Sequence, residues 1–190
     1  GGTANRNMFF RRQPNGIETS MKPVDDAAWN LASQRPRSFL EDENGIWIGY
    51  FERMLLYYSF EKQKFEIIAL KQTGYEDESL PHSFVHLKKT DDEILIVGFK
   101  QIFKYNPKKK EFTRLRTFGL NEPVNMYSVV QDKDSSWWIG GNFSTLYHFA
   151  FDFNESEIYN LASHYFNIED IIIGENNDLW LSLLGGGLAH

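Results

Sequence analysis

The sequence contains no cysteine, so disulfides, thiol nucleophiles and cysteine-ligated zinc are excluded. Long apolar runs are also missing: no stretch approaches the roughly 18 consecutive apolar residues that a membrane-spanning helix needs. Basic residues are outnumbered, with 20 Lys and Arg against 26 Asp and Glu and a formal net charge of -6. The short run Lys108-Lys109-Lys110 lies in an expected turn. We therefore expect this segment to contact neither nucleic acid nor a membrane.

Recognisable catalytic motifs are lacking as well. The five histidines do not show the His-Glu-x-x-His spacing of zinc enzymes, and there is no Gly-x-Ser-x-Gly elbow. Gly185-Gly186-Gly187 is not followed by the Lys-Ser or Lys-Thr of a phosphate-binding loop. The sequence therefore predicts a protein that is not an enzyme and that uses no metal or cofactor.

Aromatic residues are abundant, and one stretch of sequence recurs. With 16 Phe, 9 Tyr and 5 Trp, aromatics make up 16% of the chain, which suits sheets that pack face to face. The stretch 42–49 joins a polar turn to the apolar run Ile46-Trp47-Ile48. It returns in weaker form at 91–98, 132–140 and 175–182. The chain is therefore built from repeats.

The spacing of the copies predicts the fold. Gly49, Gly98, Gly140 and Ser182 mark one point of each copy and lie 49, 42 and 42 residues apart, the period of four-stranded propeller blades. Short strand patterns flank each marker. We predict an all-β chain: a β-propeller of four-stranded antiparallel blades, about four of them. The expected blades are 38–70, 83–115, 128–161 and 168–190, the last holding the inner strands of a split blade whose outer strands lie in 1–21.

A second set of landmarks follows each apolar run. Leu55, Ile102, Leu146 and Leu188 come 8, 6, 8 and 8 residues after Trp47, Ile96, Trp138 and Trp180, respectively. An aromatic residue stands three positions further on in the first three copies. In the connection 22–37, Asp25 to Leu31 could form a helical turn.

The apolar runs predict where the Trp side chains lie. Strands near a propeller axis are covered on both faces, so continuous apolar runs replace the usual alternation. Trp47, Trp138 and Trp180 are therefore expected to be buried between blades, and truncating one to Ala should cost about 3–5 kcal/mol. The small residue after each run is expected where backbones approach closely.

Acidic residues in the recurring turns suggest a calcium site, but one turn does not supply the six or more oxygen ligands that Ca²⁺ takes. The simpler interpretation is that these side chains hydrogen-bond to their own turn backbone. They are Asp42, Asp91, Asp132 and Glu175.

The repeat resembles that of the two-component regulator propeller family, whose pattern is roughly Asp-x-x-Gly-x-Leu-Trp-Ile-Gly-Thr, a Gly-Gly-Leu and then a Tyr. The stretch 42–49 with Leu55 and Tyr58 is similar to it, as is 178–181 with Gly186-Gly187-Leu188. The second copy lacks the Trp and the Gly-Gly pair, and the third has Ser144-Thr145 in place of that pair. The similarity covers about four repeats from residue 38 onward.

The resemblance implies a function that composition alone would not show. It implies the periplasmic sensor region of a hybrid two-component system of the kind found in Bacteroidetes, anchored at the inner membrane. Such a region would bind an oligosaccharide or another small-molecule signal and relay it to a kinase outside this chain. Its partners would be that signal and the rest of the sensor kinase chain.

A ligand is expected on one face of the propeller. There the loops between the second and third strands meet the connections from one blade to the next. Aromatic side chains in these loops offer flat faces to sugar rings, and Arg and Asn offer hydrogen-bond donors. The candidate ligand-binding residues are Arg35, Arg37, Tyr50, Phe51, Arg53, Lys100, Tyr127, Asn142, Phe143 and His164.

Two alternative functions stay open. A protein-interaction propeller scaffold would show large exposed apolar patches instead of a concave polar and aromatic site. A propeller lyase related to streptogramin lyases would bring His82 or His164 close to a Glu such as Glu76 or Glu122 on one face.

The two ends of the sequence raise the question of ring closure. The chain begins at Gly1 rather than at Met and stops just after Leu188, which suggests a piece of a longer protein. If the ring closes within the chain, 8–10 should pair antiparallel with 179–183. Otherwise the ends pair with blades outside the chain or with a second copy in a homodimer, because an unpaired sheet edge is a hazard.

Overall fold

The computed structural model describes residues 9–12, 18–21, 36–50, 54–69, 84–118, 125–161 and 166–190. All regular elements in these ranges are β-strands. Within them no helix is long and apolar enough to cross a membrane. The predicted helical turn at 25–31 lies outside the described residues.

Three four-stranded antiparallel sheets and one three-stranded sheet follow one another along the chain. The first blade contains β3 (Pro36–Glu41), β4 (Gly45–Tyr50), β5 (Met54–Ser59) and β6 (Lys64–Ala69). The second contains β7 (Phe84–Thr90), β8 (Glu93–Gly98), β9 (Gln101–Asn106) and β10 (Glu111–Thr117). The third contains β11 (Met126–Gln131), β12 (Trp137–Gly141), β13 (Thr145–Phe149) and β14 (Ser156–Asn160). The fourth contains β15 (Asn167–Ile173), β16 (Leu179–Leu184) and β17 (Gly187–Ala189).

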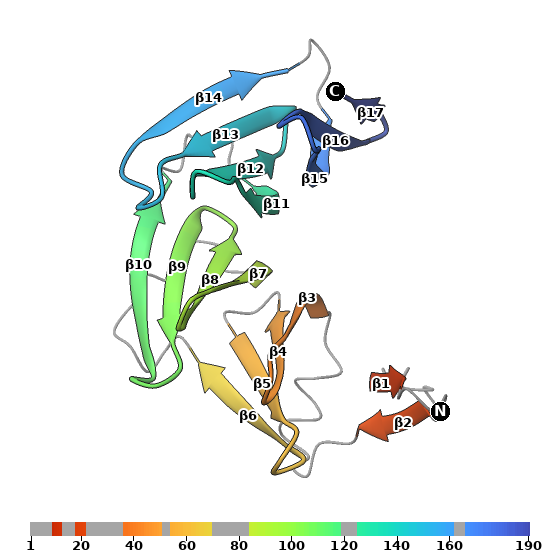
Figure 1. Cartoon of the computed structure of the whole chain (residues 1–190), viewed down its shortest axis with the longest axis vertical. Helices are drawn as coiled ribbons and strands as arrows, with labels where there is room; N and C mark the ends of the chain where they lie inside the picture. The colour runs from red at the N-terminus through yellow and green to blue at the C-terminus, as the bar shows by residue number, and fades with distance from the viewer. Residues whose placement is uncertain are drawn as a thin grey trace, which may run out of the picture.

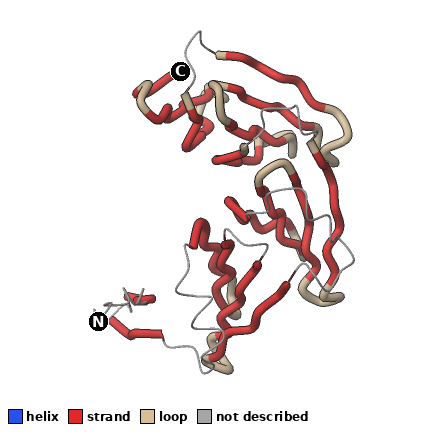
Figure 2. The backbone as a smooth tube through the Cα atoms, turned by 180° about the vertical axis from the view of Figure 1, so that it is seen from behind, coloured by secondary structure: helices blue, strands red, loops and turns tan. Residues whose placement is uncertain are grey.

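The blades are arranged as in a propeller, which confirms the predicted fold class. They are placed in chain order along an open arc (Figure 1). The first strands of successive blades contact one another, β3 with β7, β7 with β11 and β11 with β15, so these strands line the inside of the arc. The view from behind shows the same arc (Figure 2).

Strand register confirms the repeat in three blades and corrects it in the second. Gly49, Gly140 and Ser182 each pair with the inner strand on one side and with Leu55, Leu146 and Leu188, respectively, on the other. In the second blade the residue paired with Ile102 is Val97, not the expected Gly98. Gly98 instead pairs with Gln101 and closes a tight turn at Phe99-Lys100. The shorter turn explains why the sequence offset was irregular there.

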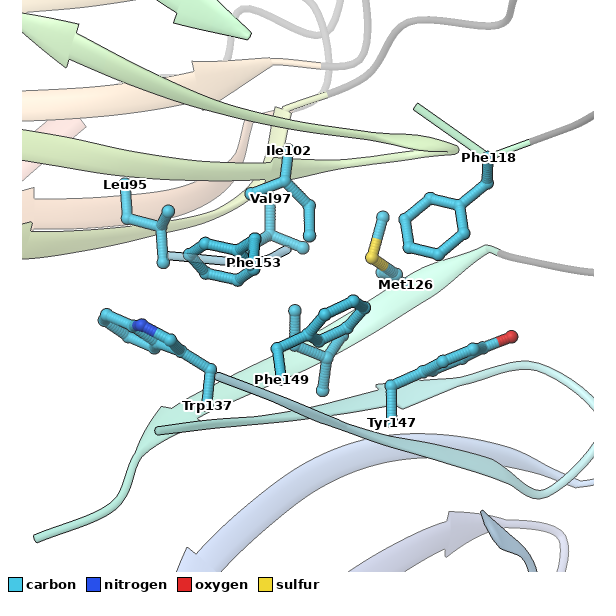
Figure 3. Packing of buried hydrophobic residues seen from close by; sticks show 10 residues of the cluster. Leu95, Val97, Ile102, Phe118, Met126, Trp137, Tyr147, Phe149 and Phe153 are labelled. Atoms are coloured by element: carbon cyan, nitrogen blue, oxygen red, sulfur yellow. The ribbon is translucent and has the colours of Figure 1, made fainter. Parts of the chain in front are cut away.

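The core consists of apolar layers between blades. Between the second and third blades, Leu95, Val97 and Ile102 face Trp137 and Phe149 (Figure 3). A second layer joins Trp47 and Leu55 of the first blade to strands of the second blade. A third joins Leu146 to the fourth blade. Each sheet in the middle of the arc is therefore buried on both faces, as the continuous apolar runs predicted.

Glycine at position 140 is required by such a close approach. A Cβ there would collide with Ser128 Oγ on the neighbouring inner strand and with the side chain of Ile168 in the fourth blade. The small residue after the apolar run thus allows two blades to approach each other, as expected.

A hydrogen bond from a Trp indole to an Asp carboxylate recurs in three blades. Trp47 Nε1 donates to Asp42 Oδ2 at 2.7 Å, and Trp138 Nε1 donates to Asp132 Oδ2 at 3.0 Å. Asp42 Oδ1 also accepts from the backbone N–H groups of Asn44 and Gly45. The carboxylate therefore orders its own turn, as predicted, and in addition fixes the orientation of the adjacent indole.

In the fourth blade the carboxylate that accepts this bond lies at the end of the turn and not at its start. Trp180 Nε1 donates to Asp178 Oδ2 at 2.9 Å, so Asp178, and not the acidic residue Glu175 of the repeat, accepts the indole bond here. Gly174 closes this turn as Asp42 and Asp132 close theirs. A Cβ at Gly174 would collide with the Asp178 carboxylate, so glycine makes room for the substitute acceptor.

Burial of the Trp anchors between blades is confirmed for Trp47, is partial for Trp138, which packs against the layer shared with the fourth blade, and is not found for Trp180. Trp47 is 5% exposed and its ring centroid is 5.7 Å from that of Tyr105 in the next blade. Trp138 is half-buried, and the neighbouring Trp137 is the buried residue of that pair. Trp180 is 38% exposed, because it lies on the face of the fourth blade that points away from the third. The exposed Trp180 has no described blade packed over that face.

The predicted pairing of the two ends is not formed in the described residues. β1 (Phe9–Arg12) pairs with β2 (Glu18–Met21) in a separate two-stranded sheet. β16 already has β15 on one edge and β17 on the other, so no edge is left for residues 9–10. Met8 lies outside the described residues. The hairpin and the fourth blade lie apart at the two ends of the arc (Figure 1).

We predict that Trp47→Ala lowers the free energy of unfolding by about 3–5 kcal/mol, because it empties a buried site between two blades. Trp180→Ala, which removes a partly exposed ring with an equivalent indole bond, should cost about 1 kcal/mol or less. Urea denaturation followed by far-UV circular dichroism measures both. Equal losses for the two variants would contradict packing between blades as the source of the stability.

Candidate functional site

Two kinds of loop come together on one face of the arc, which we call the loop face. The first are the turns between the second and third strands of each blade, and the second are the connections from one blade to the next. Phe118 N donates to Lys100 O in the second blade at 2.9 Å. In the third blade, Asn142 N donates to Asn125 O at 3.0 Å. These hydrogen bonds join the two kinds of loop on one face, where the sequence analysis expected them to gather.

The structure places five of the ten predicted ligand-binding residues on this face with described side chains. Lys100, Asn142 and Phe143 lie in turns between second and third strands, and Arg37 and Tyr127 lie at the start of inner strands. Tyr50 ends β4 opposite Pro36, but its side chain is not described. Arg35, Phe51, Arg53 and His164 lie outside the described residues.

Arg37 and Tyr127 occupy the same position of the repeat. In each inner strand the register shifts by one residue near the start, leaving one residue in a bulge. That residue is Arg37, Val85, Tyr127 or Glu169, in chain order. Bulges change the direction of a side chain and are frequent at functional sites. Glu169 was missed from the sequence, although aligning the four inner strands would have placed it with Arg37 and Tyr127.

The turn in the third blade has unusual backbone geometry. Phe143 and Ser144 both have φ of 56°, and Thr145 N donates to Asn142 O at 3.2 Å. Two consecutive left-handed residues define a type I′ turn, in which Asn and Gly are strongly preferred. A left-handed conformation costs roughly 1–2 kcal/mol for other residues. The turn is therefore strained.

Hydrogen bonds on both sides hold this strained turn in place. Ser144 is fully buried, its N–H donates to Phe166 O, and its Oγ accepts from Phe166 N at 3.1 Å. The Ser144 carbonyl accepts from Leu161 N at 3.0 Å. On the other side, Asn142 Oδ1 accepts from Asn125 N at 3.0 Å. These bonds determine the turn conformation, and the ring of Phe143 between them is 45% exposed.

Aromatic side chains connect neighbouring blades along the loop face. Phe99 of the second blade and Tyr127 of the third make an edge-to-face contact with centroids 6.1 Å apart. Phe166 bonds to Ser144 in the third blade, and its ring lies against Gly186 in the fourth. Phe99 and Phe166 were not among the predicted site residues. Phe99 directly follows the marker Gly98, where recurrence indicates blade packing as much as binding.

The opposite face, which we call the turn face, has a shallow groove of about 250 Å³ between the first and second blades. In its lining, Lys108 Nζ lies 2.8 Å from Asp92 Oδ2. In an adjoining hollow, Lys110 Nζ of the second blade lies 3.2 Å from Glu66 Oε1 of the first. The hydrogen bond from Lys108 lowers the pKa of Asp92. Burial, followed by the charges of Asp42 and Glu66, raises the pKa of the Tyr57 phenol. Lys108 and Lys110 on this face are therefore each paired with a carboxylate.

In the described ranges, no three His, Asp or Glu side chains are grouped so that they could hold a metal ion. His82, His164, Glu76 and Glu122, the residues that the lyase alternative depends on, lie outside these ranges.

His86 is a titratable group on the inside of the arc. It follows the bulge in β7, at the position that Ser38, Ser128 and Asp170 occupy in the other inner strands. Burial lowers the pKa of His86 to about 4, although the carboxylate of Asp170 acts to raise it. The imidazole is therefore neutral in the folded chain at pH 7.

Known proteins resemble this chain in structure but not in sequence. The sequence matches no protein-family model and no curated protein. The extracellular domain of BT4673 from B. thetaiotaomicron, described as a hybrid two component system, superposes with a TM-score of 0.73 at 18% identity over 96% of this chain. Virginiamycin B lyase from Staphylococcus aureus superposes with a TM-score of 0.70 at 12% identity over 94% of this chain.

These similarities show a shared propeller fold. The chain spans 24% of the BT4673 domain and 57% of the lyase. A computationally designed protein, Ika4, also superposes, with a TM-score of 0.57 at 7% identity over 82% of this chain and 89% of that protein. A sensor domain, a lyase and a designed protein share this architecture, so function has to be inferred from the site itself.

We predict that the stability of the chain falls as the pH is lowered from about 6.5 to about 4. In this window the unfolded chain protonates His86 and the folded chain does not, so protons favour unfolding. The loss should be about 1–3 kcal/mol, below the full linkage value because the side chain is only half-buried.

The pH dependence is measured by urea denaturation at several pH values. His86→Gln should flatten the curve in this window. Asp170→Asn should make the fall in stability with pH steeper, because the folded chain then loses the attraction of the Asp170 carboxylate for the protonated imidazole. A curve that His86→Gln leaves unchanged would show that other groups cause the acid sensitivity.

Proposed function

We propose that this chain is the ligand-sensing propeller of an extracytoplasmic sensor and binds an oligosaccharide on its loop face. The observation that carries the proposal is the set of aromatic residues there, Phe99, Tyr127, Phe143 and Phe166, which come from adjacent blades. Aromatic rings offer flat apolar surface at low entropic cost, and sugar rings have apolar faces that suit it. In this proposal the periplasm is the location, and a kinase outside this chain receives the signal.

Hydrogen-bonding groups accompany the aromatic residues. Lys100, Arg37 and Glu169 lie in loop-face turns or inner-strand bulges. Such groups can fix the orientation of sugar hydroxyls or of an acidic sugar. The fold shared with the extracellular domain of BT4673 supports the sensor proposal by analogy. The proposal includes binding without turnover of the ligand.

A protein-interaction scaffold is a second candidate, because the fourth blade has an exposed apolar face. Ile172 is 61% exposed and Leu188 is 68% exposed, and both lie on the face with Trp180. Exposed apolar patches commonly mark contacts with another protein surface. A scaffold would use this face and leave the loop face without a small ligand.

The test is calorimetric titration of the purified protein with defined oligosaccharides. The panel contains tetra- to hexasaccharides from arabinan, galactan, xylan, mannan and glucan, and chondroitin and heparin fragments. We expect one of these classes to bind. Tyr127→Ala should weaken that binding about tenfold or more. The matched control is Phe151→Ala, which removes a ring that is 68% exposed in a turn on the turn face and should leave binding unchanged.

The proposal has two contrary outcomes. Capture of a protein partner without binding of any oligosaccharide favours the scaffold. Release of shorter sugars from a bound oligosaccharide, detected by chromatography after incubation, shows that the chain is an enzyme.

A further inference from the structure

Two phenylalanines of the third blade have left-handed backbone conformations, and only one of them is buried. Phe153 has φ of 63°, is 0% exposed and packs on Trp137 and Phe149 with ring centroids 5.8 and 5.5 Å apart, respectively. Its strain is offset by this packing. Phe143 has φ of 56° and is 45% exposed. Burial of the Phe143 ring therefore offsets much less of the backbone strain than burial of the Phe153 ring does.

The fourth blade has a different turn, closed by a hydrogen bond from Gly186 N to Leu183 O, but it also has a left-handed residue at the position of Phe143. Pairing of Gly140 with Leu146 and of Ser182 with Leu188 aligns Phe143 with Gly185, which has φ of 82°. The repeat thus uses glycine for the left-handed position in the fourth blade and phenylalanine in the third. The backbone needs only glycine there, so the aromatic side chain has another role.

Phe166 connects the two turns into one surface. It exchanges two hydrogen bonds with Ser144, and its ring lies against Gly185 and Gly186. A Cβ at Gly187 would have no atom within 4 Å. The turn of the fourth blade is therefore a low shelf without side chains, next to the aromatic residues of the third blade. Backbone without side chains allows close approach of a ligand.

We propose that Phe143 is the residue on which the ligand stacks, and that the ligand extends from this ring across the glycine shelf 185–187. The inference rests on the proposed function and names the subsite within the loop face. A phenyl ring has no polar group, so it selects a ligand with a flat apolar face, such as the axial C–H face of a pyranose. Retained backbone strain of this kind is typical of functional sites.

The test separates folding from binding by replacing Phe143 with residues that suit the turn. Phe143→Asn and Phe143→Gly fit a left-handed position better than Phe does. We expect the Tm of both variants to stay within about 3 °C of wild type, because relief of strain compensates for the lost contacts. Phe153→Gly is the matched control, and its Tm should fall by about 10 °C or more.

Binding is measured with whichever oligosaccharide of the panel binds the wild-type protein. Phe143→Asn should weaken its affinity about tenfold or more, the usual contribution of one aromatic contact. Phe143→Trp, which keeps a flat ring, should retain binding within about threefold. Phe151→Ala should bind as wild type does.

Each outcome decides between the two proposals. If an oligosaccharide binds wild type and Phe143→Asn equally, the stacking role is wrong and the proposed function stands. If Phe143→Asn unfolds as readily as Phe153→Gly, the ring is a packing element and the inference is wrong. If no oligosaccharide binds the wild-type protein, the proposed function and this inference fail together.

Discussion

The central constraint on this chain is that the sheets in its middle are apolar on both faces. β8 and β12 are almost continuously buried, and their side chains alternate between the preceding and the following blade. A sheet of this kind is stable in water only when another sheet covers each face. Successive blades therefore stack, and the inner strands meet on the inside of the arc. Where the stack ends, as at the outer face of the fourth blade, Trp180 and Leu188 are left exposed.

The same constraint explains which features the sequence could predict. Apolar runs and their spacing come from packing that every blade repeats, so the fold class and the landmarks Leu55, Ile102 and Leu146 were predictable. The errors fall where one blade departs from the rest. The tight turn at Phe99-Lys100 moves the register by one residue, and Gly174 transfers the acceptor role to Asp178. The shorter turn shows in the sequence only as the irregular offset of 6 between Ile96 and Ile102, and the change of acceptor in the fourth blade leaves the spacing of the repeat unchanged.

From the sequence, the face that carries the candidate site could be predicted, but the geometry of its residues could not. Loop position placed Lys100, Tyr127, Asn142 and Phe143 on one face, because strand direction determines which loops share a face. The geometry that distinguishes these residues depends on contacts between distant parts of the chain. The left-handed conformation of Phe143 depends on bonds from Asn125, Leu161 and Phe166, and no local pattern at 142–145 predicts it.

The two faces of the arc differ in how their polar groups are satisfied. On the turn face, Asp42 and Asp132 bond their own turns and the adjacent indoles. Lys108 pairs with Asp92 within the second blade, and Lys110 pairs with Glu66 of the first blade. Those groups stabilise the blades, and a ligand there would have to displace them. On the loop face, hydrogen bonds are used to hold a strained turn, and an aromatic ring stays partly exposed. Binding to such a preorganised ring costs little further ordering. A ligand would therefore bind more favourably on the loop face, because folding has already fixed the conformation of the ring that it would contact.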